Sequence, residues 1–207
     1  RIVTVGIDPI LDKYKKFYKK INFKISDFFS YQSLKKKIKI KFKVITALSM
    51  FYDLKNPNKF LSDIKKILDK NGIFILEHAD LLSILKNNLF DSICHEHLEY
   101  YSSKIILDLM KKNNLRVFNV QKNQVNGGST RYYISHDKSK FITNSKALNK
   151  IIKEEKKYKL DSVKTFKSFE KKLITKKKKM MSFITKQKKQ GKIIHGYGAS
   201  TKGNVLL

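Results

Sequence analysis

Short apolar runs alternate with helix-like segments along the first half of the chain. Residues 2–7 and, more weakly, 22–25 are predicted strands, and the lysine-rich stretch between them can be helical. Residues 44–48 form a continuous apolar run, VITAL, which is typical of a strand buried on both faces. Apolar residues recur at helical spacing over 60–68, and the Asn-Gly pair that follows is predicted to end this helix before the next apolar run, IFIL, at 73–76. The alternation of strand, helix and strand predicts an α/β fold with a parallel sheet.

The second half begins with a capped helix and two more strands. Ser102 and Ser103 form a capping pair for a predicted helix whose apolar residues share one face. Residues 115–120 and 131–135 alternate like sheet strands, and the NGG sequence between them predicts a turn.

From Ser145 to Gln190 the chain is rich in lysine and helical in pattern. An apolar stripe on this stretch is expected to pack into the core, and it consists of Val163, Phe166, Phe169, Leu173, Met180, Met181 and Ile184. The lysines between these residues are expected to face water. We expect the stretch to lead into a second α/β unit that begins at Ile193 and Ile194 and is cut off within its first helix.

The charge of the chain is strongly positive. Its 207 residues include 46 basic and 17 acidic side chains, which give a formal net charge of +29. Such an excess is typical of nucleic-acid-binding proteins, but arginine, whose planar fork suits bases and phosphates, occurs only at positions 1, 116 and 131. The lysines are spread over the whole chain, so we interpret the charge mainly as compositional bias. A lysine-based nucleic-acid-binding module remains an alternative hypothesis.

Hydropathy and cysteine content limit the class of protein. Hydrophobic residues make up 41% of the chain, which excludes a disordered protein. Cys94 is the only cysteine, which fits a reducing, cytoplasmic setting and leaves no cysteine-based zinc site. No apolar run approaches the length of a membrane span, so no membrane partner is expected. Because the chain starts inside a strand-like run without an initiator methionine, we expect it to be an internal fragment of a longer protein.

The densest group of ionisable side chains is DSICHEHLEYYS, residues 91–102. His95, Glu96 and His97 are adjacent there, with apolar residues on both sides. Histidine can take up or release a proton near neutral pH, and a neighbouring carboxylate can orient it or increase its basicity. A two-histidine zinc site is not indicated, because its ligands need one helical turn between them. The pattern is compatible with acid–base catalysis and equally with histidines that only bridge buried groups.

A glycine-rich segment, HGYGASTKGN, occupies residues 195–204. Glycines let backbone N–H groups approach a phosphate, and a helix N-terminus favours negative charge. Lys202 adds a cation, although the residue order is not that of the ATP-binding P-loop. The segment is a candidate phosphate cradle or, alternatively, a tight turn between a strand and a helix.

Three weaker motifs also contain candidate binding residues. Arg131 ends the VNGGSTR segment, and its planar guanidinium suits a phosphate or a carboxylate. Asp8 belongs to GIDP, and an acidic residue at a strand end of a nucleotide-binding sheet can accept hydrogen bonds from both ribose hydroxyls. Asp27 and Phe28 follow the next predicted strand, where they can face an adenine. Exposed turns are the alternative interpretation of each motif.

The chain resembles one family in five segments that run from its first residues to its last. These segments are GIDP, ITALSMFYDL, FDSICHEHLEYYS, the NGGS turn with Arg131, and YGASTKGN. The family is that of the sugar C-methyltransferases, which depend on S-adenosyl-L-methionine (SAM) and act on nucleotide-linked keto-sugars. Two positions depart from the family, since Asp80 stands where tyrosine is frequent and Cys94 replaces a tyrosine of some members.

This resemblance implies a fold and a domain organisation. Residues 1–100 would form a partial class I methyltransferase (Rossmann-like) sheet. Residues 101–207 would form a truncated C-terminal α/β substrate-binding domain, entered through the helical connection. The family's N-terminal zinc-binding segment would lie outside this chain, together with the first strand and the glycine loop that holds the methionine part of SAM. Zinc is therefore expected only in that missing segment, and no metal site is expected here.

The resemblance also implies methylation of a carbon next to a ketone. His97 would be the base, and Glu96 and His95 would orient it or the sugar. An inactive remnant of such an enzyme is a further alternative, because the SAM glycine loop is expected to be missing.

The binding residues follow from the same resemblance. Asp8 would hold the SAM ribose, and Asp27 and Phe28 would lie near its adenine. The nucleotide-sugar side would be lined by Tyr101, Asn126, Arg131, Tyr197, Ser200, Lys202 and Asn204.

Overall fold

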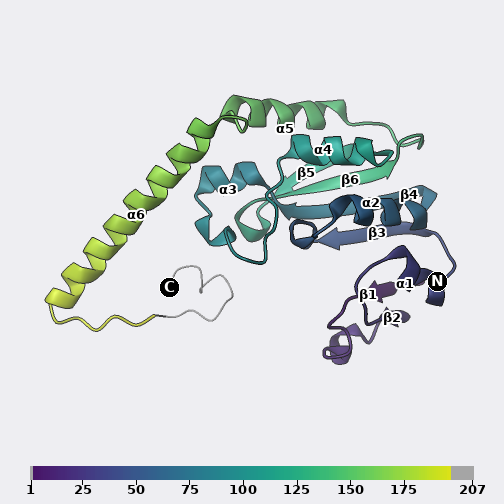
Figure 1. The fold of residues 1–207 in the computed structure, drawn as a ribbon, viewed down its shortest axis with the longest axis horizontal. Coiled ribbons are helices and arrows are strands. Elements are labelled where there is room, and N and C mark those ends of the chain that lie inside the picture. Colours follow the sequence, from purple (N-terminus) through teal and green to yellow (C-terminus); the bar gives the residue numbers. More distant parts are fainter. Residues whose placement is uncertain (1, 197–207) are drawn as a thin grey trace.

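The computed structural model describes residues 2–196, and the chain begins with a small two-stranded parallel sheet (Figure 1). Its strands are β1 (Val5–Ile7) and β2 (Phe23–Ile25), with a short 3-10 helix, η1 (Lys15–Tyr18), between them. Helix α1 (Tyr31–Lys37) follows β2 and is capped by the side chain of Ser30. Both predicted strands are confirmed, whereas the helical stretch between them is limited to η1.

The main sheet has four strands in the order β3-β4-β6-β5. These strands are β3 (Phe42–Leu48), β4 (Leu68–Ala79), β5 (Leu115–Asn123) and β6 (Ser129–His136). β3 and β4 run parallel, while β6 is antiparallel to both β4 and β5. The predicted parallel strand–helix–strand unit and the predicted pair of later strands are therefore confirmed, and they share one sheet.

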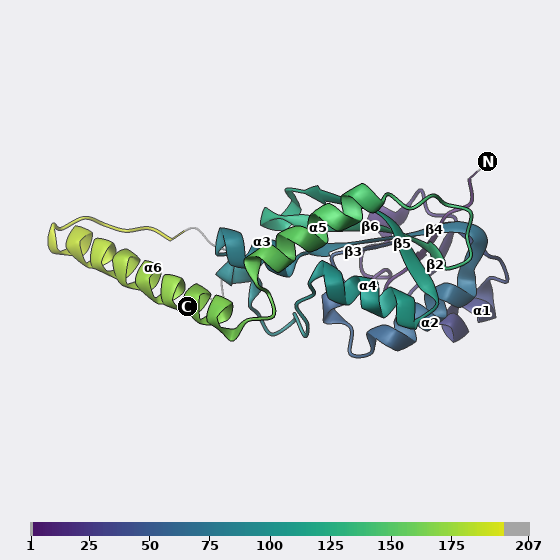
Figure 2. The same ribbon diagram turned by 90° about the horizontal axis from the view of Figure 1, so that it is seen from above.

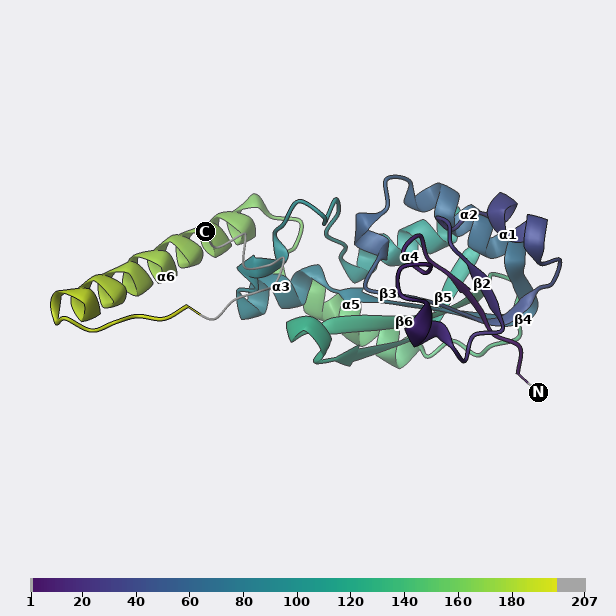
Figure 3. The same cartoon turned by 90° about the horizontal axis from the view of Figure 1, so that it is seen from below.

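Helices and short turns connect the strands. Between β3 and β4 lie η2 (Phe51–Asp53) and α2 (Pro57–Ile67), and between β4 and β5 lie α3 (Leu81–Asn87), η3 (Phe90–Ser92) and α4 (Ser103–Lys112). The turn η4 (Val125–Gly127) joins β5 to β6, and α5 (Ser145–Tyr158) and α6 (Val163–Lys189) follow. Figures 2 and 3 show α2 and α4 on the same side of β3 and β4, and α5 packs against β5 and α4. Among the helices of residues 2–196, none has the length and apolar character needed to cross a membrane.

The core lies between this helical layer and the sheet. Leu61 and Ile64 recur at helical spacing on α2 and are buried, as are Phe74 and Leu76 on β4. Other fully buried members of the same core are Phe51, Ile106, Met110, Leu115, Tyr132 and Ile134. Each such side chain contributes about 1.5–3 kcal/mol through its burial, so this layer stabilises the sheet.

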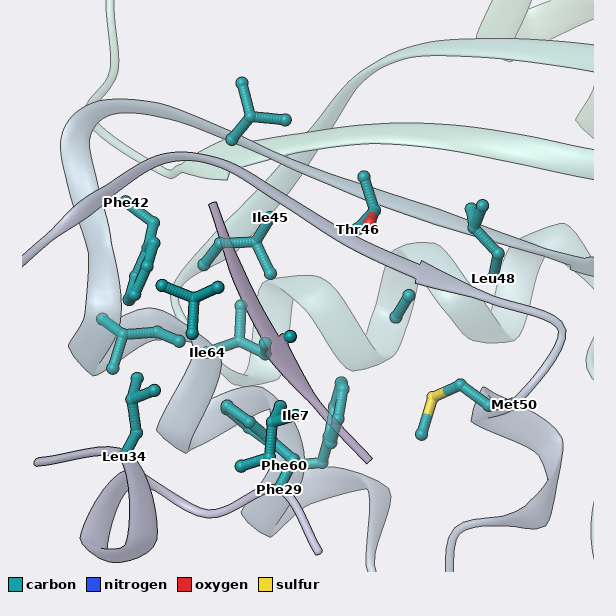
Figure 4. Close-up of a pocket in the computed structure, with 15 residues that line it drawn as sticks. Ile7, Phe29, Leu34, Phe42, Ile45, Thr46, Leu48, Met50, Phe60 and Ile64 are labelled. Carbon is teal, nitrogen blue, oxygen red and sulfur yellow. The ribbon is translucent and has the colours of Figure 1, made fainter. Parts of the chain in front are cut away.

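An apolar gap separates the two sheets. β3 is an edge strand of the four-stranded sheet, and β1 is an edge of the two-stranded one. A cavity of about 360 Å³ lies between them, lined by residues 5–7, residues 44–48 and apolar side chains that include Phe29 and Met50 (Figure 4). Consecutive residues of a strand point to opposite faces of the sheet. Because every residue of 5–7 and of 44–48 lines the cavity, the cavity must run along the free edges of β1 and β3.

This gap overturns the expectation that residues 44–48 are buried on both faces. Val44 is 58% exposed and Leu48 is 51% exposed. Their partners in β4 are Ile73 and Glu77, so they occupy the sheet face opposite the buried Leu76. The strand prediction is correct, but its burial is wrong because β1 faces the β3 edge only across the cavity and leaves Val44 and Leu48 exposed.

The end of α2 also differs from the prediction. The helix ends at Ile67 and β4 begins at Leu68, so Asn71 and Gly72 lie inside the strand rather than at a helix end. A Cβ atom on Gly72 would come within 2.6 Å of the carbonyl oxygen of Phe42. Glycine at position 72 therefore allows β3 and β4 to approach closely. The pairing of the two strands is irregular at the same place, between Phe42 and Val44.

Helix α6 extends away from the sheets (Figures 1 and 2). Of the apolar stripe predicted to be core, Phe169 alone is buried, and Leu173 is partly buried next to it. Val163, Met180 and Met181 are 68%, 53% and 50% exposed. The helix prediction is confirmed, but the core-packing prediction is wrong because α6 extends away from the sheets and leaves most of the stripe exposed.

The C-terminal organisation is only partly described. Strands β5 and β6 lie beyond residue 100 and still pair in the sheet of β3 and β4. The predicted domain boundary at residue 100 stays a prediction, although the sheet itself continues past it. The strand expected at Ile193 and Ile194 is absent from the described residues, which end at 196, and Ile193 is 83% exposed.

Candidate active site

His97 is held near the carboxyl end of β3, on the 3-10 turn η2. The carbonyl oxygen of Tyr52 accepts hydrogen bonds from the backbone N–H groups of Leu98, at 3.0 Å, and Glu99, at 3.1 Å. The ring centroids of Tyr52 and His97 are 4.2 Å apart, and the ring of Tyr100 lies edge-on to His97 at 6.2 Å. Residues 94–99, called here the His97 loop, are thus docked on η2.

The three adjacent ionisable residues of this loop differ in exposure. His97 is partly buried, whereas His95 and Glu96 are exposed. A hydrogen bond from its own backbone N–H, together with the Cys94 thiol, lowers the pKa of the Glu96 carboxyl. Glu96 is therefore ionised at neutral pH, and His97 is the member of the trio that other side chains enclose.

Asp53 adds a second carboxylate near His97. Burial raises the pKa of Asp53, the His97 charge opposes that shift, and the Glu96 charge adds to it. Burial and the Asp53 charge raise the pKa of Tyr52, against a hydrogen bond with the Ser49 side chain. The Tyr52 hydroxyl therefore stays protonated at neutral pH, and Asp53 and Glu96 are the acidic groups that act electrostatically on His97.

A second polar cluster lies at the carboxyl end of β4. Glu77 is 4% exposed, and its Oε2 accepts hydrogen bonds from Arg131 Nε at 2.6 Å and from Asn123 Nδ2 at 2.9 Å. Glu77 and Arg131 are direct partners in the pairing of β4 with β6. A buried carboxylate requires such donors because burial disfavours its charged form. Glu77, Asn123 and Arg131 are called here the Glu77 cluster.

The NGG turn connects the two groups of residues. Asn126 Nδ2 donates to Ser49 Oγ at 3.4 Å, and the backbone N–H of Ser49 donates to the Glu77 carbonyl oxygen at 2.8 Å. Ser49 in turn interacts with the Tyr52 side chain. The turn and the carboxyl end of β3 thereby connect the Glu77 cluster with the His97 loop.

Two family models match consecutive parts of the chain. Residues 2–120 match a model described as a methyltransferase domain. Residues 124–207 match a model described as a C-methyltransferase C-terminal domain. The chain belongs to the methyltransferase-domain family, and its C-terminal part is similar to the C-terminal domain of C-methyltransferases.

A curated relative and a solved structure extend the comparison. The C-methyltransferase NovU of Streptomyces niveus is 27% identical over 165 residues, which cover 80% of this chain and 39% of NovU. The chain thus spans well under half the length of that relative. A crystal structure of an S-adenosylmethionine-dependent methyltransferase from Clostridium acetobutylicum matches with a TM-score of 0.50 and 13% identity, over 65% of this chain and 75% of its own. This likeness confirms the predicted class I, Rossmann-like α/β fold.

Asp8, the predicted ligand of the SAM ribose, lies beside the apolar gap. Asp8 directly follows β1, and its Oδ1 accepts a hydrogen bond from Ile10 N at 2.9 Å. Its Oδ2 has no hydrogen-bond partner among the described residues, so it can accept from a ribose hydroxyl. The neighbouring cavity of about 360 Å³ has apolar walls, including Ala47 and Met50, and lies in the size range of small-ligand sites.

Asp27 and Phe28 form an exposed turn after β2. Asp27 Oδ1 accepts a hydrogen bond from Phe28 N at 2.7 Å, and the Phe28 side chain is 76% exposed. The next residue, Phe29, which the sequence did not single out, lines the gap. The contacts of Asp27 and Phe28 with an adenine stay a prediction.

Tyr101 lies in the core of the fold. It is 5% exposed, and its ring packs against Phe51 at 5.2 Å and His78 at 5.8 Å. Burial raises the pKa of Tyr101 to about 12 and lowers the pKa of His78, so both side chains are neutral at pH 7. The structure does not bring Tyr101 to the surface that carries Asn126 and Arg131.

The remaining predicted substrate residues, Tyr197, Ser200, Lys202 and Asn204, lie outside the described residues. Residues 2–196 contain no group of three or more His, Cys, Asp or Glu side chains that could hold a metal ion.

Five residues of the site were not singled out from the sequence, namely Ser49, Tyr52, Asp53, Glu77 and Asn123. Glu77 directly follows the buried run IFIL, and a carboxylate at the end of a parallel strand was a detectable signal. Ser49 and Tyr52 lie within the ITALSMFYDL segment, but no local pattern distinguishes them from its other residues.

Proposed function

We propose that the protein containing this chain methylates a carbon next to the ketone of a nucleotide-linked keto-sugar, with SAM as methyl donor. The observation that carries the proposal is the environment of His97, a partly buried imidazole on the Tyr52 ring with Asp53 and Glu96 nearby. The similarity of residues 124–207 to the C-terminal domain of C-methyltransferases supports carbon as the acceptor. The keto-sugar rests on the HEHLEYYS and YGASTKGN motifs, and the reducing cytoplasm suits the single Cys94.

His97 acts as the general base in this proposal. A neutral imidazole is a competent base near pH 7, and a C–H bond beside a ketone is acidic enough for it to attack. A ring nitrogen of His97 takes the proton, the C–H electron pair becomes the double bond of an enolate, and the carbonyl oxygen gains the negative charge. SAM supplies an electrophilic methyl group, which forms the new carbon–carbon bond with the enolate while its bond to sulfur breaks.

The carboxylates around His97 support this step. Proton uptake makes the imidazole positive, and the negative charges of Asp53 and Glu96 stabilise that form. Glu96 and His95 orient His97 or the sugar in the proposal.

Arg131 and Asn126 bind the nucleotide part of the substrate, together with Tyr197, Ser200, Lys202 and Asn204, whereas the buried Tyr101 is no longer among the proposed ligands. The guanidinium of Arg131 is engaged by Glu77 through Nε and also hydrogen-bonds the Tyr133 side chain, so phosphate oxygens would bind its remaining N–H donors. The net charge of +29 raises the local concentration of such an anionic substrate. Residues 101–207 are the substrate-binding part of the chain in this proposal.

The test is His97→Ala in the longest form of the protein that the gene encodes. Methyl transfer from labelled SAM to a nucleotide-linked keto-sugar should fall about 10²- to 10⁴-fold, the usual contribution of a general base. SAM binding, measured by calorimetry, should stay within about twofold because His97 does not contact the adenosine part in the proposal.

The matched control is Leu98→Ala, which changes the next, half-exposed residue of the same loop and should retain methyl transfer. Unchanged turnover in the His97 variant would remove this residue from the mechanism. An equal loss in both variants would attribute the effect to the loop as a whole.

A further inference from the structure

The contact between Tyr52 and His97 is the closest ring pair in the described part of the chain. The ring centroids are 4.2 Å apart and the planes are inclined by 50°. Other ring pairs among residues 2–196 are separated by 4.7 Å or more, as for Phe118 and Phe141. The imidazole therefore has one aromatic ring directly against it.

Tyr52 is well placed to act as a rigid support. Its neighbour Phe51 is fully buried and packs on Phe60 and Tyr101, which fixes η2 to the core. The ring of Tyr52 also meets the buried ring of His78 nearly perpendicularly, at 6.4 Å. The buried His78 ring is therefore a second aromatic neighbour of Tyr52.

The same residue also fixes the backbone that carries the imidazole. The Tyr52 carbonyl oxygen accepts the hydrogen bonds of Leu98 N and Glu99 N, directly after His97. One residue thus contacts the His97 ring through its side chain and the His97 loop through its main chain.

We propose that Tyr52 is a positioning residue for His97, which holds the imidazole in place and stabilises its protonated form through the face of the tyrosine ring. An aromatic face attracts a cation, and this attraction arises only after the imidazole takes its proton. The inference rests on the proposed function, in which His97 is the base.

Other groups face His97 and must be separated from Tyr52 in any test. Tyr100 lies edge-on to the imidazole, and the carboxylates of Asp53 and Glu96 act on it by charge. The carboxylate effects weaken as salt screens them, whereas a ring contact depends little on salt. The Cys94 carbonyl oxygen accepts the backbone N–H of His97 and does not contact its ring nitrogens.

The experiment compares Tyr52→Phe, Tyr52→Leu and Tyr52→Trp in the longest form of the protein. Tyr52→Phe keeps the ring and should leave kcat within about twofold, while Tyr52→Leu should lower kcat about tenfold with little change in KM, because only orientation and charge stabilisation are lost. The acid limb of the kcat/KM profile should move to lower pH in Tyr52→Leu and to higher pH in Tyr52→Trp, since indole is the stronger cation-binding face.

A spectroscopic readout tests the contact without substrate. The ring-proton resonances of His97 should carry a ring-current shift in the wild-type chain and in Tyr52→Phe, and should lose it in Tyr52→Leu. Asp53→Asn is the control, because it removes a neighbouring charge and should leave the ring-current shift in place. Circular dichroism checks that each variant is folded, and the opposite response of Tyr52→Trp remains informative if Tyr52→Leu does not fold.

The outcomes distinguish this inference from the proposed function. If His97→Ala abolishes methyl transfer while all three Tyr52 variants behave like the wild type, the positioning role is overturned and the base remains. If the ring-current shift is present but His97→Ala retains methyl transfer, the proposed function fails and Tyr52 has no reaction to support.

Discussion

At the residue scale, several residues of the candidate active site have uncommon backbone conformations. Ser49 and Asn126 both have a φ of 53°, and Gly127 and Gly128 follow with 82° and 138°. Such angles cost free energy in residues that carry a Cβ atom, so they persist only where surrounding contacts impose them. Here they bring the side chains of Ser49 and Asn126 within 3.4 Å of each other.

Gly128→Ala tests this part of the site. A Cβ atom at position 128 would lie 2.7 Å from the Cβ and Oγ atoms of Ser83, and φ is also unfavourable for alanine. We expect the free energy of unfolding, measured in urea, to fall by about 2–4 kcal/mol. Gly191→Ala is the control, because φ is +73° there but no atom lies within 4 Å, and it should cost only about 1–2 kcal/mol. Equal losses would show that the clash with Ser83 is absent.

At the element scale, helix α4 is capped by local and by distant residues. Ser102 Oγ accepts a hydrogen bond from Ile105 N at 3.4 Å, as the predicted capping pair indicates. The buried carboxylate of Glu155, on α5, accepts from Ser103 N at 2.5 Å and from Lys104 N at 3.1 Å. A negative charge at a helix N-terminus is favourable, so Glu155 both caps α4 and fixes α5 against it.

Replacement of Glu155 by glutamine should therefore destabilise the fold. The amide keeps the size of the side chain but loses the charge and one acceptor, which should cost about 1–3 kcal/mol in urea unfolding. Its neighbour provides the control, since Glu154 makes salt bridges with Lys86 and Lys122 at the surface. Glu154→Gln should cost under about 1 kcal/mol. The capping role of Glu155 would be refuted by equal effects of the two substitutions.

At the scale of the whole molecule, a strongly positive net charge opposes association between chains, whereas the exposed apolar edge of β3 favours it. The net charge of +29 makes copies of the chain repel one another, and about 0.1 M salt screens this repulsion beyond roughly 10 Å. The free edge of β3 has Val44 and Leu48 more than half exposed. Unpaired apolar edges of this kind favour association between chains.

Self-association of the 207-residue chain should consequently increase with salt. We expect sedimentation velocity to show larger species as NaCl rises from about 0.05 to 0.5 M, where the screening length shortens severalfold. Leu48→Lys should suppress them by placing a charge on the β3 edge. Val125→Lys adds the same charge at an exposed position on η4 and serves as the control. Suppression by both variants would attribute the effect to added charge alone rather than to the strand edge.

Strands, turns and helix caps could be predicted from the sequence, because each depends on residues that are close together along the chain. The alternation of apolar and polar residues predicted strands β5 and β6, and the NGG sequence predicted the turn between them. The serine pair predicted the cap of α4, which is Ser102. Continuous apolar runs located β3 and β4. These signals are local because strand pleat, helix period and capping are set by residues a few positions apart.

The tertiary structure alone decided burial and side-chain partnerships. Residues 44–48 form a strand, as predicted, but they are not buried on both faces. Their exposure depends on which distant segment lies beside the strand. The pairing of Glu77 with Arg131 and the contact of Tyr52 with His97 join residues more than forty positions apart. Such contacts leave no period in the sequence, because they follow from how the sheet and its loops pack in space.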